Sequence, residues 1–192
     1  WGASSNVFIT GGTTSTGLSN NAQTFGNFTY NSATSTATMS AFTSTTTAVI
    51  QGNLTILATG VIGGTGIFRA TSGTGLVTIN GNVTISQGRF QATSTSTGTV
   101  IANGNTTIDA NGILDLSTTG TGGFSQRGNL FTNDGVLTGT SGTLSFVNFT
   151  GSAAQTLAGS GTVLTNIASL NMQNTAGLTI THTNPIIVAR VN

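Results

Sequence analysis

A six-residue phrase that returns along the chain constrains its fold more than any other feature of the sequence. Residues 51–56 read Gln-Gly-Asn-Leu-Thr-Ile, residues 80–85 read Asn-Gly-Asn-Val-Thr-Ile, and residues 103–108 read Asn-Gly-Asn-Thr-Thr-Ile. A degraded copy, Arg-Gly-Asn-Leu-Phe-Thr, occupies residues 127–132, and the glycines of consecutive copies lie 29, 23 and 24 residues apart. Such a period is typical of stacked structural repeats, each of which is too small to bury a core alone.

Inside each copy the apolar residues alternate with polar ones. Leu54 and Ile56 flank Thr55, so the apolar side chains of an extended strand would share one face. Stacked coils would align these residues into an internal column of Ile56, Ile85 and Ile108. A second internal column would hold the apolar residue that follows the next glycine of each copy, namely Ile62, Phe90 and Leu114.

The asparagine of each phrase is expected to stack as well. Amides that repeat at one strand spacing can hydrogen-bond from one coil to the next, as in other stacked β-arrays. The predicted structural ladder consists of Asn53, Asn82, Asn105 and Asn129.

The composition agrees with an all-β fold. Thr, Ser, Gly and Asn dominate, and Thr, Val and Ile suit pleated strands. Hydrophobic residues make up 36% of the chain, which argues against disorder. We therefore predict one repetitive domain over residues 1–192, a parallel β-solenoid with coils of about 23–29 residues. An antiparallel β-sandwich remains the alternative, because it also has short strands with turn signals.

Several segments also resemble a known family. They are residues 149–161, Phe-Thr-Gly-Ser-Ala-Ala-Gln-Thr-Leu-Ala-Gly-Ser-Gly, residues 25–31, Phe-Gly-Asn-Phe-Thr-Tyr-Asn, and the Gly-Asn-x-Thr-Ile repeat itself. They are similar to phrases in very large secreted surface proteins of Bacteroidota-type bacteria. The resemblance implies export by the type IX route, an extracellular or cell-surface location, and a role in adhesins, fibres or surface layers. It suggests no catalytic residues. Since the sequence starts at Trp1 without a signal-peptide pattern, we expect a fragment or processed segment of a longer secreted protein.

Charge limits the classes of partner. The net charge is +1, charged residues make up 4% of the chain, and the four arginines are scattered. Phosphate binding requires clustered Lys and Arg, so we expect no nucleic acid partner. No apolar run approaches the roughly 20 residues of a membrane-spanning helix, so we expect no membrane insertion. Low charge also favours self-association, because little repulsion opposes it.

Few residues could carry chemistry. The candidates are Asp109, Asp115, Asp134 and His182. Asp109 and Asp115 straddle a glycine and should lie on different faces, while Asp134 lies in an Asn-Asp-Gly turn phrase. We therefore expect no catalytic site, no enzyme activity and no cofactor. A Ca²⁺ site formed by Asp109 and Asp134 on adjacent coils is the alternative, although the nine-residue calcium repeat of other solenoids is missing.

The function expected from these features is structural. The chain would form a segment or subunit of a surface fibre, sheath or adhesin, associating with itself end to end or with neighbouring domains. Its predicted contact segments are the apolar stretches near the two ends: Val7, Phe8 and Ile9, and Ile186, Ile187 and Val188.

The alternative function is a glycan- or ice-binding module that uses a Thr-rich β face. Its evidence is three Thr/Ser runs, at residues 34–36, 43–47 and 93–97. Regular Thr columns on one flat face would support this alternative, and scattered hydroxyls would count against it.

Overall fold

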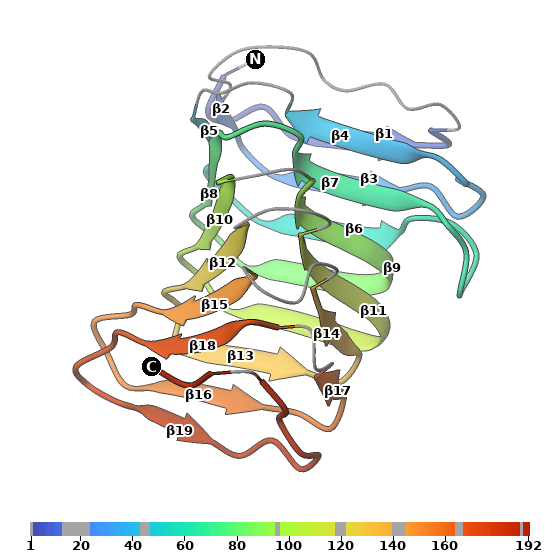
Figure 1. Cartoon of the computed structure of the whole chain (residues 1–192). Helices are drawn as coiled ribbons and strands as arrows, with labels where there is room; N and C mark the ends of the chain where they lie inside the picture. The colour runs from blue at the N-terminus through green and yellow to red at the C-terminus, as the bar shows by residue number, and fades with distance from the viewer. Residues whose placement is uncertain are drawn as a thin grey trace.

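The chain folds into a stack of short parallel strands. A computed structural model describes residues 2–12, 24–42, 47–94, 97–117, 122–139, 145–163, 167–188 and 190–192. Every strand pairing recorded between these residues is parallel, and each turn of the chain lies on the turn before it (Figure 1). The predicted β-solenoid is confirmed, and the antiparallel sandwich is wrong.

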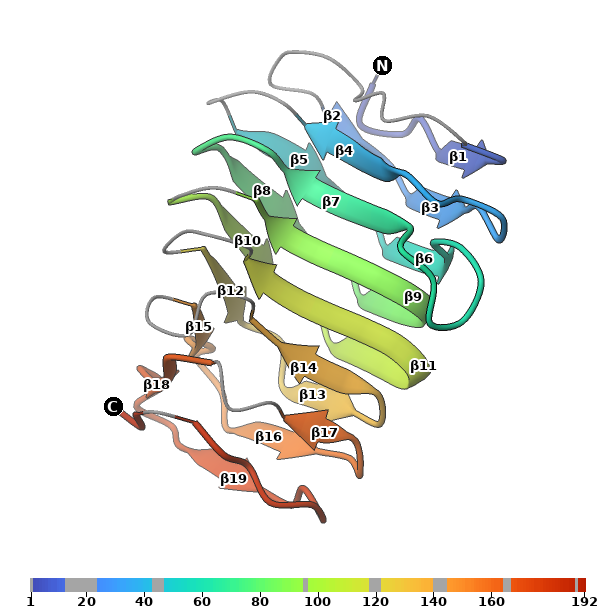
Figure 2. The ribbon, with the colours of Figure 1, turned by 45° about the vertical axis from the view of Figure 1, so that its right-hand side comes forward.

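The strands form three walls around the core. Wall 1 contains β1 (Val7–Thr10), β3 (Phe28–Asn31), β6 (Leu54–Ala58), the first half of β9 (Val83–Thr93), the first half of β11 (Thr106–Ser117), β13 (Leu130–Asn133), β16 (Gln155–Ala158) and β19 (Leu178–Ile180). Wall 2 contains β4 (Thr38–Phe42), β7 (Ile67–Thr71), the second halves of β9 and β11, β14 (Val136–Thr138) and β17 (Thr162–Val163). Figure 2 shows β9 and β11 running through both walls, which makes one 12-stranded sheet of them.

Wall 3 is a separate seven-stranded sheet. It contains β2 (Thr24–Phe25), β5 (Ala48–Ile50), β8 (Leu76–Ile79), β10 (Thr99–Ala102), β12 (Gly123–Gln126), β15 (Phe146–Phe149) and β18 (Ser169–Met172). The chain returns to this wall once per turn, so about six turns separate the first of its seven strands from the last.

The register gives the length of each turn. Val7 pairs with Phe28 and Leu54 pairs with Val83, so turns in wall 1 range from 21 to 29 residues. The longest turn contains the loop around residues 59–66, between β6 and β7.

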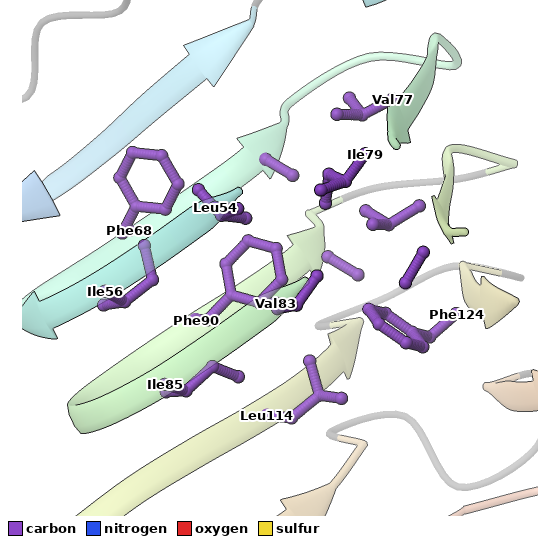
Figure 3. Packing of buried hydrophobic residues seen from close by; sticks show 14 of the residues in the cluster. Leu54, Ile56, Phe68, Val77, Ile79, Val83, Ile85, Phe90, Leu114 and Phe124 are labelled. Atoms are coloured by element: carbon purple, nitrogen blue, oxygen red, sulfur yellow. The ribbon is translucent and has the colours of Figure 1, made fainter. Parts of the chain in front are cut away.

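The core consists of columns of apolar side chains that run along the solenoid. Ile85 pairs with both Ile56 and Ile108, and all three side chains are fully buried, as expected. Figure 3 shows Ile56 and Ile85 in this column. In the second column Phe90 pairs with Leu114, but the position before Phe90 belongs to Phe68. Ile62 is 65% exposed in the loop, so its assignment to this column was wrong. The loop lies between the glycine that precedes Ile62 and strand β7. The inward position of this turn therefore moves six residues along the chain, from Ile62 to Phe68.

Glycines form the corner between walls 3 and 1. The backbones of successive turns approach each other there so closely that a side chain would not fit. The amide of Gly104 donates to the carbonyl oxygen of Gly81 at 3.1 Å, and the amide of Gly81 donates to that of Gly52 at 2.9 Å. A Cβ at Gly104 would lie 2.4 Å from the Gly81 oxygen. Since real Cβ atoms do not approach so closely, only glycine fits this corner without a shift of the backbone.

Candidate functional site

The asparagine ladder follows the glycine corner at the start of wall 1. The Oδ1 atom of Asn53 accepts the backbone N–H of Asn82 at 2.8 Å, and Oδ1 of Asn82 accepts that of Asn105 at 2.9 Å. Asn6 and Asn27 extend the ladder toward the N-terminus in the same way. Among the described residues these bonds join a side chain to the next backbone, and at Asn27 the side-chain amide also donates to Oδ1 of Asn6 at 3.0 Å, as the sequence suggested.

Asn129 lies outside this ladder. Thr106 pairs with Phe131, so the fourth copy of the phrase contains one extra residue relative to the third. The backbone N–H of Leu130 consequently donates to Oδ1 of Asn105 at 3.1 Å in the place that Asn129 was expected to fill.

A second ladder does join side chains directly, on the residue before each corner glycine. Nδ2 of Asn80 donates to Oε1 of Gln51 at 2.7 Å, and Nδ2 of Asn103 donates to Oδ1 of Asn80 at 2.7 Å. Nη1 of Arg127 donates to Oδ1 of Asn103 at 3.4 Å. This ladder could have been predicted from the first residue of each phrase, because that residue has a carboxamide side chain in three of the four copies.

Threonines line the outer face of wall 1 in five successive turns, from β3 to β13. The register aligns each of them with the next, and all are partly exposed: Thr29, Thr55, Thr84, Thr107 and Thr132. They belong to the repeat phrase and not to the three Thr/Ser runs. Of those runs, residues 34–36 lie in the connection before β4, Thr93 is buried, and residues 43–46 and 95–96 lie outside the described residues.

Asp109 and Asp134 occupy neighbouring turns at the corner after wall 1. The amide of Asp134 donates to the carbonyl of Ile108 at 2.8 Å, which places the two aspartates at successive levels. Oδ1 of Asp134 accepts the N–H of Ser160 at 2.9 Å and its hydroxyl at 3.1 Å, so this carboxylate caps the following turn. In the described part of the chain, no group of three or more His, Cys, Asp or Glu residues could hold a metal ion.

The third carboxylate, Asp115, lies on wall 2 in a buried polar network. Its side chain is fully buried, and Oδ2 accepts Nε2 of Gln91 at 2.9 Å. Nη1 of Arg89 lies 3.7 Å from the same oxygen, and Nε of Arg69 donates to Oε1 of Gln91 at 2.6 Å. Burial lowers the pKa of the Arg69 guanidinium, and attraction to Asp115 opposes this effect.

The candidate catalytic groups lie in two parts of the molecule: Asp109, Asp134 and His182 at or near the end of wall 1, and Asp115 on wall 2. Asp109 and Asp115 belong to different walls, because β11 passes from wall 1 to wall 2 between them. His182 follows β19 near the C-terminal end, where Nδ1 lies 2.9 Å from the carbonyl oxygen of Asn184. Its Nε2 lies 3.4 Å from Nδ2 of Asn133.

The two apolar end segments differ in exposure. At the N-terminal end Val7 is 8% exposed and points into the core, whereas Phe8 is 63% exposed on the outer face. At the C-terminal end Ile187 is 53% exposed, and Ile186 and Val188 are partly buried against the core.

Comparisons with protein-family models, curated proteins and solved structures find no match to this chain. Within the residues that the structure describes, there is no helix with the length and hydropathy needed to traverse a bilayer.

Proposed function

We propose that this chain is an extracellular structural protein, a rigid segment or subunit of a cell-surface fibre, sheath or adhesin. The observation that carries the proposal is that polar side chains join successive turns along the solenoid axis. The ladder of Gln51, Asn80, Asn103 and Arg127 and the ladder that starts at Asn6 both run across several turns. We infer that these side chains hold the turns of the rod together and do not form a binding site.

A third ladder supports the same role near the C-terminal end. Nδ2 of Asn171 donates to Oδ1 of Asn148 at 2.6 Å, and Nδ2 of Asn192 donates to Oδ1 of Asn171 at 2.7 Å. Stacked amides of this kind strengthen the contact between strands that already share backbone hydrogen bonds. The polar residues of wall 3 thus contribute to cohesion in the later turns as well.

The role proposed for the carboxylates is also structural. Asp134 caps a turn, and Asp115 neutralises arginines within its own wall. The family resemblance of residues 25–31 and 149–161 supports the proposed surface location.

Immunogold electron microscopy tests the proposal. Antibodies raised against the purified chain should label fibres or a layer outside intact cells of the organism that makes it. Labelling confined to the cell interior after sectioning would overturn the proposal. Pre-immune serum provides the control for background.

Binding of a glycan or of ice is a second candidate, favoured by the Thr column of wall 1. Five hydroxyls at one strand spacing, about 4.8 Å, form a regular array over five successive turns. The test compares a Thr84→Val/Thr107→Val variant with Thr78→Val on wall 3 in ice-recrystallisation and insoluble-polysaccharide binding assays. A loss confined to the double variant supports this candidate, and no binding by the unaltered chain rejects it.

A further inference from the structure

Three asparagines in the chain are followed directly by glycine: Asn80, Asn103 and Asn111. In such a pair the backbone nitrogen of the glycine can attack Cγ of the asparagine, because glycine has no Cβ to obstruct the five-membered ring that forms. Ammonia leaves, and water then opens the ring. The reaction needs no enzyme, and asparagine is counted among the thermolabile residues. Its rate at each pair depends on how freely the side chain and the next backbone nitrogen move.

Asn80 and Asn103 are held at the groups that the reaction must move. Nδ2 of Asn80 donates to Oε1 of Gln51 at 2.7 Å, and Oδ1 of Asn80 accepts Nδ2 of Asn103 at 2.7 Å. The attacking nitrogens are held as well, because the amides of Gly81 and Gly104 donate to carbonyl oxygens of the preceding turn at 2.9 and 3.1 Å. Ring closure at either asparagine would have to break these hydrogen bonds.

Asn111 has different surroundings, at the corner where β11 passes from wall 1 to wall 2. Its side chain is exposed, and in the described part of the chain no hydrogen bond of its carboxamide is recorded. Ile108 pairs with Ile85 and Asn111 pairs with Gln87, so β11 contains one extra residue just before Asn111. An extra residue of this kind disrupts the ladder locally. Asn80 is exposed too, so the hydrogen bonds and not the exposure distinguish the two asparagines.

We propose that Asn111 is a site of spontaneous deamidation, and that the ladder through Asn80 and Asn103 protects the other two pairs from the same reaction. At Asn111 a bond forms between the Gly112 nitrogen and Cγ, the bond between Cγ and Nδ2 breaks, and the Gly112 amide proton leaves with Nδ2 as ammonia. Water then adds to one of the two ring carbonyl carbons. Addition at Cγ gives aspartate, and addition at the backbone carbonyl carbon gives isoaspartate. The new carboxylate lowers the net charge by one from +1. The inference does not depend on the proposed structural role.

Peptide mapping by mass spectrometry measures the three rates. The folded 192-residue chain is incubated at mildly alkaline pH, and samples taken over time are unfolded and digested with trypsin. Trypsin cleaves after Arg89 and Arg127. Asn103 and Asn111 therefore lie in one peptide, where fragmentation compares them directly, and Asn80 lies in the preceding peptide.

Asn111 should lose ammonia at least about tenfold faster than Asn80 or Asn103, since each hydrogen bond that must break slows the other two. The chain unfolded in urea gives the reference, because there all three pairs should react at similar rates. Equal rates at the three pairs in the folded chain overturn the proposal. So does a folded chain in which Asn111 stays intact while the unfolded chain reacts.

Two variants separate protection by the ladder from other causes. Gln51→Ala removes the acceptor of the Asn80 side chain, so the rate at Asn80 should rise several-fold while the rate at Asn111 is unchanged. Asn111→Gln is the matched control, because glutamine would need a six-membered ring, and it should abolish the fast reaction. Circular dichroism checks that both variants fold, and the comparison of the three rates in the unaltered chain stands without them. An unchanged rate at Asn80 in a folded Gln51→Ala variant overturns the protective role of the ladder.

Discussion

Substitution of Gly104 by alanine tests the close approach of successive turns at the corner. An added Cβ would lie 2.4 Å from the carbonyl oxygen of Gly81, 2.6 Å from its carbonyl carbon and 2.7 Å from Oδ1 of Asn82. Two of these three atoms are backbone and cannot rotate away. The turn must therefore move, which costs about 1–3 kcal/mol for overpacking. Weakening the Gly104–Gly81 hydrogen bond adds about 1 kcal/mol. We expect a total loss of about 3 kcal/mol in the free energy of unfolding.

Urea unfolding followed by far-UV circular dichroism measures this loss. Gly12→Ala is the matched control, because the nearest atom to its added Cβ is the Tyr30 hydroxyl oxygen at 3.5 Å, an ordinary contact. The control should change the free energy of unfolding by no more than about 0.5 kcal/mol. A loss of less than about 1 kcal/mol for Gly104→Ala, at an unchanged slope with urea, would refute the close approach.

Three further substitutions test the core and the polar contacts. Ile85→Ala should lower the free energy of unfolding by about 2–5 kcal/mol because it opens a cavity in the internal column, whereas Ile62→Ala should change it little; thermal and urea unfolding compare the two. Asn82→Ala removes the acceptor for the next turn and should cost about 1 kcal/mol, while Asn82→Asp keeps that acceptor and should cost less in the same assay. Asp115→Ala leaves Nε2 of Gln91 without its acceptor and Arg89 without its carboxylate, and should cost about 2–4 kcal/mol, less than a fully buried ion pair because the Arg89 side chain is 39% exposed; an Arg89→Ala background should reduce this loss, and equal losses in both backgrounds would contradict the coupling.

The parts of the fold that repeat could be predicted from the sequence. The spacing of the glycines indicated the turn, and alternation around Thr55 and Thr84 indicated which side chains point inward. These features depend on local geometry that is the same in each turn. A period and an alternation were therefore enough to place Ile56, Ile85 and Ile108 in one column.

The departures from the repeat could not be predicted, because they depend on how one turn adapts to another. The loop before β7 moves the inward position from Ile62 to Phe68, and one extra residue replaces Asn129 by Leu130 in the ladder. Both changes preserve the stacking of the core while they break the local phrase. Aligning the copies of the repeat by sequence takes no account of how the side chains pack. It therefore placed Ile62 in the core column and Asn129 in the ladder, and both placements were wrong.

The arrangement at the ends also required the structure. Val7 and Ile180 are the first and last members of one inward column of wall 1, and each is an aliphatic residue in a short strand. Their sequences therefore predict the same environment, yet Val7 is 8% exposed and Ile180 is 49% exposed. The difference depends on whether anything covers the terminal turn, which is a tertiary property that no local pattern encodes. The exposure of Ile180 therefore follows from its place in the stack of turns and not from its local sequence.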